Sequence, residues 1–152
     1  NVDPEYLQKP RKWETRSIKS FMAFMGPLSS VFDILCFAVM WWIIKANTPA
    51  MAPLFQCGWF VFGTVSQVLV IHMIRSGKVP FVQSMAAKPL LLSTTIVALA
   101  AVLVGFSALA SGLDMAPLPL GFLPWLVLLL AGYCLSTQFF KAIYIRRFGE
   151  WL

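Results

Sequence analysis

The order of apolar and polar positions divides the chain into four long apolar segments separated by short polar ones. The clearest segment, residues 54–74, contains no Lys, Arg, Asp or Glu. At a rise of 1.5 Å per residue it forms about 31 Å of helix, which is enough to cross the hydrocarbon core of a bilayer. We expect the other three segments to pack around it.

The other three apolar segments also predict membrane-spanning helices, over residues 18–44, 90–110 and 122–144. Gly26 and Pro27 interrupt the first of them, and proline removes a helical hydrogen bond and clashes with the preceding turn. Two arrangements remain open for this segment. Either residues 17–25 form a separate interfacial turn, or the whole segment is one long bent helix.

The composition of the chain agrees with a membrane protein. Of its 152 residues, 59% are hydrophobic and 12% are charged, and the mean hydropathy is +0.78. Soluble domains carry about 25% charged residues, so a water-soluble core is excluded. The fold class that we predict is all-α: an integral membrane bundle of four transmembrane helices. Residues 1–17 form a linker on the cytosolic side, and residues 18–152 form the membrane domain.

The basic residues predict the orientation of the helices. Eleven of the twelve Lys and Arg residues lie in the N-terminal segment, in the loop of residues 75–89 or at the C-terminal end. The loop of residues 45–53 has one, and that of residues 111–121 has none. Since cytosolic loops are enriched in Lys and Arg, we expect both termini and loop 75–89 in the cytosol. The net charge of +6 does not indicate nucleic-acid binding, because anionic lipid accounts for basic residues that flank apolar segments.

Asp33 is the only carboxylate within a predicted membrane span. An ionised carboxylate is costly there, so such a residue is paired, protonated or functional. It lies about 16 Å from the outer end of its helix, and Ser66 and Gln67 lie about 18 to 20 Å from the outer end of the next one. We therefore expect Asp33 to meet the face with Ser66 and Gln67. These three residues are the candidate ion-path residues. A structural hydrogen bond between helices is the alternative, since a divalent cation requires several oxygen ligands.

Other polar groups in the apolar segments indicate structural roles. His72 lies one turn before Arg75 and is interpreted as an interfacial histidine. Thr94 can bond back to carbonyls of its own helix. Thr137 and Gln138 are expected to join neighbouring helices by hydrogen bonds.

The sequence predicts neither a catalytic centre nor a metal site. It contains no glycine-rich phosphate loop, no nucleophile placed beside a base, and a single histidine. Cys36, Cys57 and Cys134 lie in apolar segments without the spacing of a metal site, and cysteine there behaves as a small hydrophobic residue. The chain by itself is therefore not expected to hydrolyse a substrate.

Several stretches of the chain resemble a known family. They are QKPRKW at residues 8–13, FMGPLSSVFDIL at 24–35, the Trp pair at 41–42, LFQCGWFVFGTVSQVLVIHMIR with VPF within 54–81, and LPWLVLLLAGY at 123–133. With these stretches the chain resembles the C-terminal membrane region of bacterial magnesium-transporting P-type ATPases over nearly its whole length. The resemblance implies that the four helices are the seventh to tenth of ten.

What the resemblance implies about function concerns a larger pump. It implies an ATP-driven importer of Mg²⁺ in the bacterial inner membrane, with ATP and Mg²⁺ bound by parts outside this sequence. The phosphorylation motif, the nucleotide and actuator domains, and the helices that supply the main ion ligands are not in these 152 residues. The implied role is to brace the transport helices, with the bilayer and the rest of the pump as partners. Gln67 stands where sodium pumps also have a glutamine, whereas Val70 replaces their aspartate, which argues against a direct ion ligand on this helix.

Two alternatives to this interpretation remain open. One is a free-standing four-helix membrane protein, either a small transporter or an interaction partner. The other is a different P-type pump, such as a calcium transporter, which would be expected to have more carboxylates within residues 54–74. The chain begins at Asn1 with a polar segment, from which we expect a piece of a larger protein or a processed product.

Overall fold

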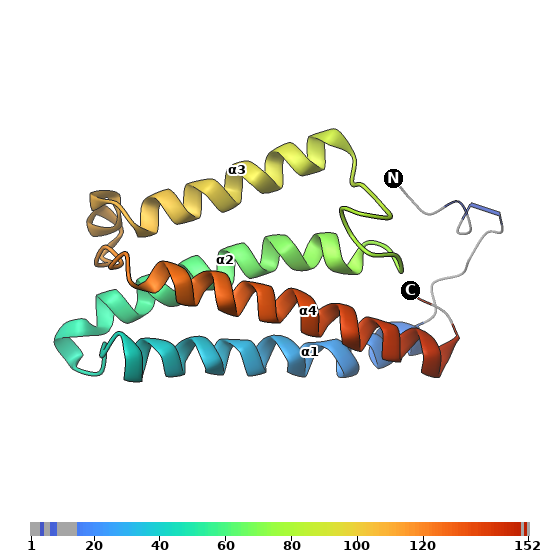
Figure 1. Ribbon diagram of the computed structural model, residues 1–152, viewed down its shortest axis with the longest axis horizontal. Coiled ribbons are helices and arrows are strands. Elements are labelled where there is room, and N and C mark those ends of the chain that lie inside the picture. Colours follow the sequence, from blue (N-terminus) through green and yellow to red (C-terminus); the bar gives the residue numbers. More distant parts are fainter. Residues whose placement is uncertain (1–3, 5–6, 9–14, 150, 152) are drawn as a thin grey trace.

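The computed structural model describes residues 4, 7–8, 15–149 and 151 (Figure 1). Its helices are α1 (Thr15–Ala38) with its π-helical continuation η2 (Val39–Ile43), η3 (Pro49–Met51), α2 (Ala52–Ile74), α3 (Lys88–Gly105), η4 (Ala108–Leu113) and α4 (Phe122–Phe148). In this described part, four helical segments are long and apolar enough to cross a membrane, so the protein is a multi-pass membrane protein of the predicted all-α class. The predicted linker, residues 1–17, lies mostly outside the described residues, and the first helix begins at Thr15 rather than at residue 18.

The central helix of the bundle is α2, as its apolar sequence predicted. It contacts α1, α3 and α4, and α1 also contacts α4, while α3 lies beyond α2 (Figure 1). The helices alternate in direction, so the beginning of α1 and the end of α4 meet at one end of the bundle. There the rings of Phe21 and Trp151 lie 5.2 Å apart between centroids. The assignment of this end to the cytosol stays a prediction.

The first helix passes through Gly26 and Pro27 without a break. The arrangement with a separate turn over residues 17–25 is therefore wrong, and a single long helix is correct. Proline is tolerated within membrane helices because neighbouring groups satisfy the backbone groups that it frees. The irregular turn lies at the other end of the segment, where the amide of Ile44 donates to the carbonyl of Val39 (3.0 Å) in a π-helical turn.

The third and fourth helices end at other residues than predicted. α3 ends at Gly105 instead of residue 110, and the chain turns back so that the amide of Leu118 donates to the Gly105 carbonyl (2.8 Å). A Cβ atom at Gly105 would overlap the side chain of Val61 on α2, so the close approach of these helices depends on glycine. α4 continues beyond residue 144 to Phe148.

Apolar side chains fill the space between the helices and also cover their outer faces. Those with almost no exposed surface include Cys36, Met40, Cys57, Val61, Phe62 and Phe122. Large exposed apolar side chains occur on all four helices, among them Leu35, Ile71, Leu103 and Leu128. So much exposed apolar surface suits hydrocarbon rather than water, in agreement with a bundle that lies in a membrane.

Candidate polar site within the membrane

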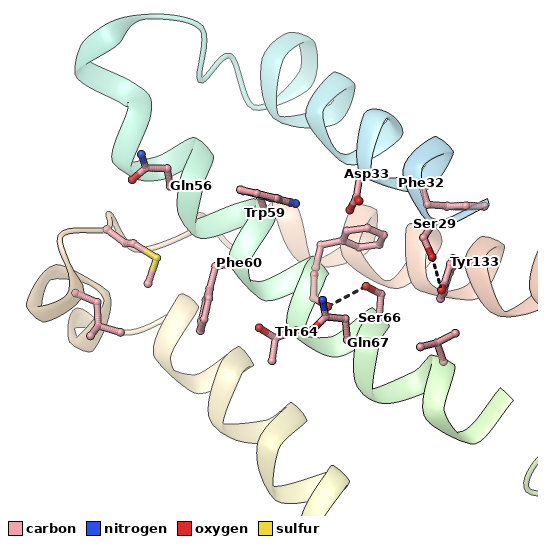
Figure 2. Close-up of a pocket in the computed structure, with 15 residues that line it drawn as sticks. Ser29, Phe32, Asp33, Gln56, Trp59, Phe60, Thr64, Ser66, Gln67 and Tyr133 are labelled. Atoms are coloured by element: carbon pink, nitrogen blue, oxygen red, sulfur yellow. Dashed lines mark hydrogen bonds between the residues drawn. The ribbon is translucent and has the colours of Figure 1, made fainter. Parts of the chain in front are cut away.

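The three candidate ion-path residues line one pocket between α1 and α2, with a volume of about 640 Å³ (Figure 2). The polar residues in its walls are Ser29, Asp33, Gln56, Thr64, Ser66, Gln67 and Tyr133. Aromatic side chains, including Trp59 and Phe60 of α2, form much of the remaining wall. The estimate of depth from the helical rise thus placed Asp33, Ser66 and Gln67 in the same part of the bundle.

The carboxylate of Asp33 extends from α1 into this pocket and is half-buried (Figure 2). No hydrogen bond joins it to Ser66 or Gln67 among the residues that the structure describes. The structure therefore places the three residues around one pocket but does not form the interhelical bond that was the alternative interpretation. Their role in an ion path stays a prediction.

Ser66 and Gln67 differ in what they offer to the pocket. The hydroxyl of Ser66 donates to the carbonyl of Gly63 in its own helix (3.0 Å), so only its oxygen lone pairs remain to accept a bond. The side chain of Gln67 is exposed and carries both a donor and an acceptor. Asp33 and Gln67 are therefore the two residues whose polar groups are most available within the pocket.

A hydrogen bond that the sequence did not predict forms part of the pocket wall. The hydroxyls of Ser29 on α1 and Tyr133 on α4 lie 2.9 Å apart. The ring of Phe32 packs edge-on against Tyr133, with 5.5 Å between the centroids. Ser29 precedes Asp33 by four residues, so both lie on one face of α1. This spacing is the signal in the sequence that could have placed Ser29 beside Asp33 in the pocket.

The side chains that line the pocket are better suited to bind hydrogen-bond donors than to bind a metal ion tightly. It presents one carboxylate, two amide side chains and several hydroxyls. Within the described residues, no group of three His, Cys, Asp or Glu side chains is placed to hold a metal ion. Mg²⁺ prefers six oxygen ligands in an octahedron, which a single carboxylate does not supply. Asp33 is better placed to accept hydrogen bonds or to form an ion pair with a neighbouring segment.

His72 joins α2 to α3 by a hydrogen bond, and its predicted place at the membrane interface stays a prediction. Its Nε2 lies 2.9 Å from the hydroxyl of Thr94, and both residues are buried. The Thr94 hydroxyl donates to the carbonyl of Leu90 (2.7 Å), which confirms the predicted bond within its own helix. Since that hydrogen is used, Thr94 accepts from a proton on His72 Nε2. This bond is a polar attachment of α3 to the central helix.

Thr137 and Gln138 do not form the hydrogen bonds between helices that we expected. The hydroxyl of Thr137 donates to the carbonyl of Tyr133, one turn earlier in α4 (2.7 Å). The buried oxygen of the Gln138 amide has no hydrogen-bond partner among the described residues. The prediction for Thr137 was therefore wrong, because its own helix offers a carbonyl at the right distance.

Lys141 occupies a buried site that the sequence did not reveal. Because α4 extends to Phe148, Lys141 lies about two turns inside the helix instead of at its predicted end. Its side chain has no exposed surface, and its ammonium group donates to carbonyls at the end of α2. In the sequence it looked like a basic residue that flanks a membrane span, and only the length of α4 distinguishes the two placements.

The cysteines behave as small apolar residues within the helix contacts. Cys36 and Cys57 are buried, and their sulfurs lie 4.0 Å and 3.5 Å from the carbonyl oxygens of Gly58 and Gly105 on neighbouring helices. Cys134 is partly buried. All three are free thiols.

Known proteins share this sequence to a high degree. The family described as cation transporting ATPase, C-terminus, matches residues 1–143. The magnesium-transporting ATPase, P-type 1, of Escherichia coli K12 is 52% identical over 149 residues. Proteins with the same name from Salmonella typhimurium strains 14028s and LT2 are 50% and 47% identical over 149 and 150 residues.

These alignments cover almost all of this chain but a small part of each relative. They include 98–99% of the chain and 16–17% of the relatives, so the chain spans about one sixth of the length of the curated relatives that it matches. The family match extends over most of the sequence and includes the helices that line the pocket. The chain therefore belongs to the family of cation-transporting ATPase C-terminal regions.

Proposed function

We propose that this chain is the C-terminal membrane support region of an ATP-driven pump that imports Mg²⁺ across the bacterial inner membrane. The observation that carries the proposal is the identity of 47–52% with magnesium-transporting P-type ATPases over nearly the whole chain. The substrate and the energy source come from the names of those relatives. In this proposal ATP and Mg²⁺ are bound by other parts of the pump.

The packing of the helices supports a bracing role. α2 is in contact with the other three membrane helices, and hydrogen bonds between helices occur near both the pocket and the end of the bundle. Such bonds restrict sliding between helices, because breaking them in hydrocarbon leaves polar groups without partners. A rigid unit of this kind suits the anchoring of more mobile transport helices.

The pocket supports a contact with the rest of the pump. Asp33 and Gln67 present polar groups that would be costly against lipid. We propose that the remaining transmembrane helices cover this side of the bundle. The lipid bilayer and the cytosolic domains of the pump complete its partners.

The size of the native polypeptide tests this proposal first. Membranes are blotted with an antibody against the C-terminal peptide, and the expected band is several times larger than 17.0 kDa. The full-length protein should then restore growth of a strain deficient in Mg²⁺ uptake at low Mg²⁺, and should hydrolyse ATP. A band at the size of this chain would contradict the proposal and favour a free-standing four-helix protein.

The transported ion is tested separately in the full-length protein. Uptake of Mg²⁺ is measured in vesicles with and without ATP, beside matched samples with Ca²⁺ in place of Mg²⁺. ATP-dependent uptake of Mg²⁺ is the expected result. Uptake of Ca²⁺ alone would assign the chain to a calcium pump and refute the substrate, while leaving the bracing role unaffected.

A further inference from the structure

Three backbone carbonyls at the end of α2 converge on the ammonium group of Lys141. The Nζ atom donates to the carbonyls of Met73, Ser76 and Lys78 at 2.8, 3.0 and 2.9 Å. These three oxygens are called the carbonyl cluster below. Lys141 comes from α4, more than sixty residues further along the chain, and has no exposed surface. The cluster is therefore a contact between distant segments within the interior.

The carbonyl cluster exists because a helix ends there. The last carbonyls of an α-helix have no partner within the helix, and they carry partial negative charge from the aligned peptide dipoles. α2 ends at Ile74, so the carbonyl of Met73 is one of this group. The chain then turns, and the carbonyls of Ser76 and Lys78 come to face the same point. An ammonium group has three donors and no acceptor, which matches three converging oxygens.

Trp151 covers the same site from the C-terminal end. Its ring lies 5.6 Å from Nζ of Lys141, within the range of a cation–π interaction. Its Nε1 donates to the carbonyl of Ile74 at 2.9 Å, which satisfies a further oxygen at the end of α2. The rings of Phe21 and Tyr144 pack edge-on against Trp151 and hold it in place. The ammonium group thus lies against both the three carbonyls and the ring of Trp151.

We propose that the carbonyl cluster is a monovalent-cation site in which the ammonium group of Lys141 is the resident cation. Rings of backbone carbonyls also bind K⁺ in channel filters, where the oxygens replace its hydration shell. The distances of 2.8–3.0 Å suit an ammonium ion or a cation of similar size. They are too long for Mg²⁺, which binds oxygen at about 2.0–2.1 Å in an octahedron. Removal of the side chain opens the cluster to ammonium or K⁺ from solution.

As a positioning residue, Lys141 fixes the end of α2 and the start of the following loop against α4. Without a cation, the three carbonyls would lose the donor that they share, and their mutual repulsion would open the end of the bundle. This role concerns the stability of the bundle and does not depend on the ion that the proposed pump transports.

The test replaces Lys141 in the full-length protein and measures thermal unfolding. The side chain of Lys141→Met is one heavy atom shorter, so this variant removes the ammonium group with its charge and donors and leaves the position of Nζ vacant for a cation. We expect its unfolding midpoint to fall by several degrees in choline chloride, and to recover with a saturable dependence on NH₄⁺ or K⁺ at constant ionic strength. Mg²⁺ and tetramethylammonium should restore nothing. No recovery with NH₄⁺ or K⁺, or equal recovery with tetramethylammonium, would overturn the proposal.

Two further variants keep the test decisive if Lys141→Met does not accumulate. Lys141→Arg introduces a planar guanidinium group, whose N–H donors spread outward and cannot be shared by three oxygens around one point. The unfolding midpoint of this variant should therefore fall and should not respond to NH₄⁺. An unchanged midpoint in Lys141→Arg would show that positive charge alone suffices and would contradict the proposal. Lys19→Met removes an exposed lysine near the same end of the bundle and serves as the matched control, with no change expected.

Discussion

The end and the middle of α2 differ in how their polar groups are paired. At its end, the carbonyls of Met73 and Ile74 accept bonds from Lys141 and Trp151 of the C-terminal segment. In its middle, the side chain of Gln67 faces a pocket that it shares with Asp33, and no hydrogen bond joins the two within the described part of the chain. The end of α2 is closed by contacts within this chain, whereas its middle presents polar groups to a pocket of about 640 Å³.

This difference distinguishes polar groups that stabilise the bundle from polar groups that remain available for other contacts. A polar group in a membrane is stable when it has a partner, and the end of α2 obtains its partners from α4. The pocket in the middle contains an acid and an amide that do not bond to each other in the described part of the chain. In the proposed function they face the remaining helices of the pump. Substitutions should therefore affect folding at the end of α2 and transport in its middle.

The largest effect on stability is expected at Lys141. Lys141→Met removes the donor that the three carbonyls share, at a cost of about 3 kcal/mol or more in the free energy of unfolding. Denaturation of the full-length protein in detergent measures this loss in the free energy of unfolding. A loss within the error of the measurement would contradict the view that the end of α2 is held by α4.

The same substitution at two glycines, Gly77 and Gly63, compares the stability of the two regions. A Cβ atom at Gly77 would lie 3.3 Å from Cβ of Trp151, whose ring is held on several sides, whereas Gly63 in the pocket has no atom within 4 Å of this position. We expect Gly77→Ala to cost about 1–2 kcal/mol. Gly63→Ala should be neutral or gain up to about 1 kcal/mol, because alanine favours the helix. Equal losses in both variants would contradict the comparison.

The hydrogen bond between Ser29 and Tyr133 at the pocket wall should contribute less to the free energy of unfolding than the contacts at the end of α2. Tyr133→Phe removes the bond to Ser29 and is expected to cost about 1 kcal/mol, because the two hydroxyls lose each other as partners. Ser29→Ala should have a similar cost, and the double variant should cost less than the sum of both. Additive losses would show that the two hydroxyls act independently.

The smallest effect on stability is expected at Asp33. Asp33→Asn keeps the shape of the side chain and removes its charge, so the free energy of unfolding should change by less than about 0.5 kcal/mol. The matched control is Asp114→Asn, which alters an exposed carboxylate outside the membrane helices. A large destabilisation by Asp33→Asn alone would support the structural interpretation of this residue.

The features that follow from helix geometry could be predicted from the sequence. Four apolar segments gave four helices, and the constant helical rise gave a common depth for Asp33 and Gln67, which share a pocket. The orientation of their side chains could not be predicted, since the depth of a residue does not fix the rotation of its helix. Contact between the two residues depends on that rotation and on side-chain rotamers.

The features that were missed depend on contacts between distant segments. α3 ends at Gly105 because the chain turns back where it approaches Val61, and no local pattern marks that turn. Lys141 resembles the other basic residues that flank membrane spans. Its burial follows from carbonyls that lie more than sixty residues earlier in the chain. A single sequence contains no signal for such a pairing.

The most direct test measures stability and transport together in two variants of the full-length protein. Unfolding midpoints and Mg²⁺ uptake are compared for Lys141→Met and Asp33→Asn beside the unmodified protein. We predict a low midpoint for Lys141→Met, and an unchanged midpoint with reduced uptake for Asp33→Asn. Equal midpoints in all three proteins, or a fall of the same size in both variants, would contradict the division of α2 into a closed end and an available middle.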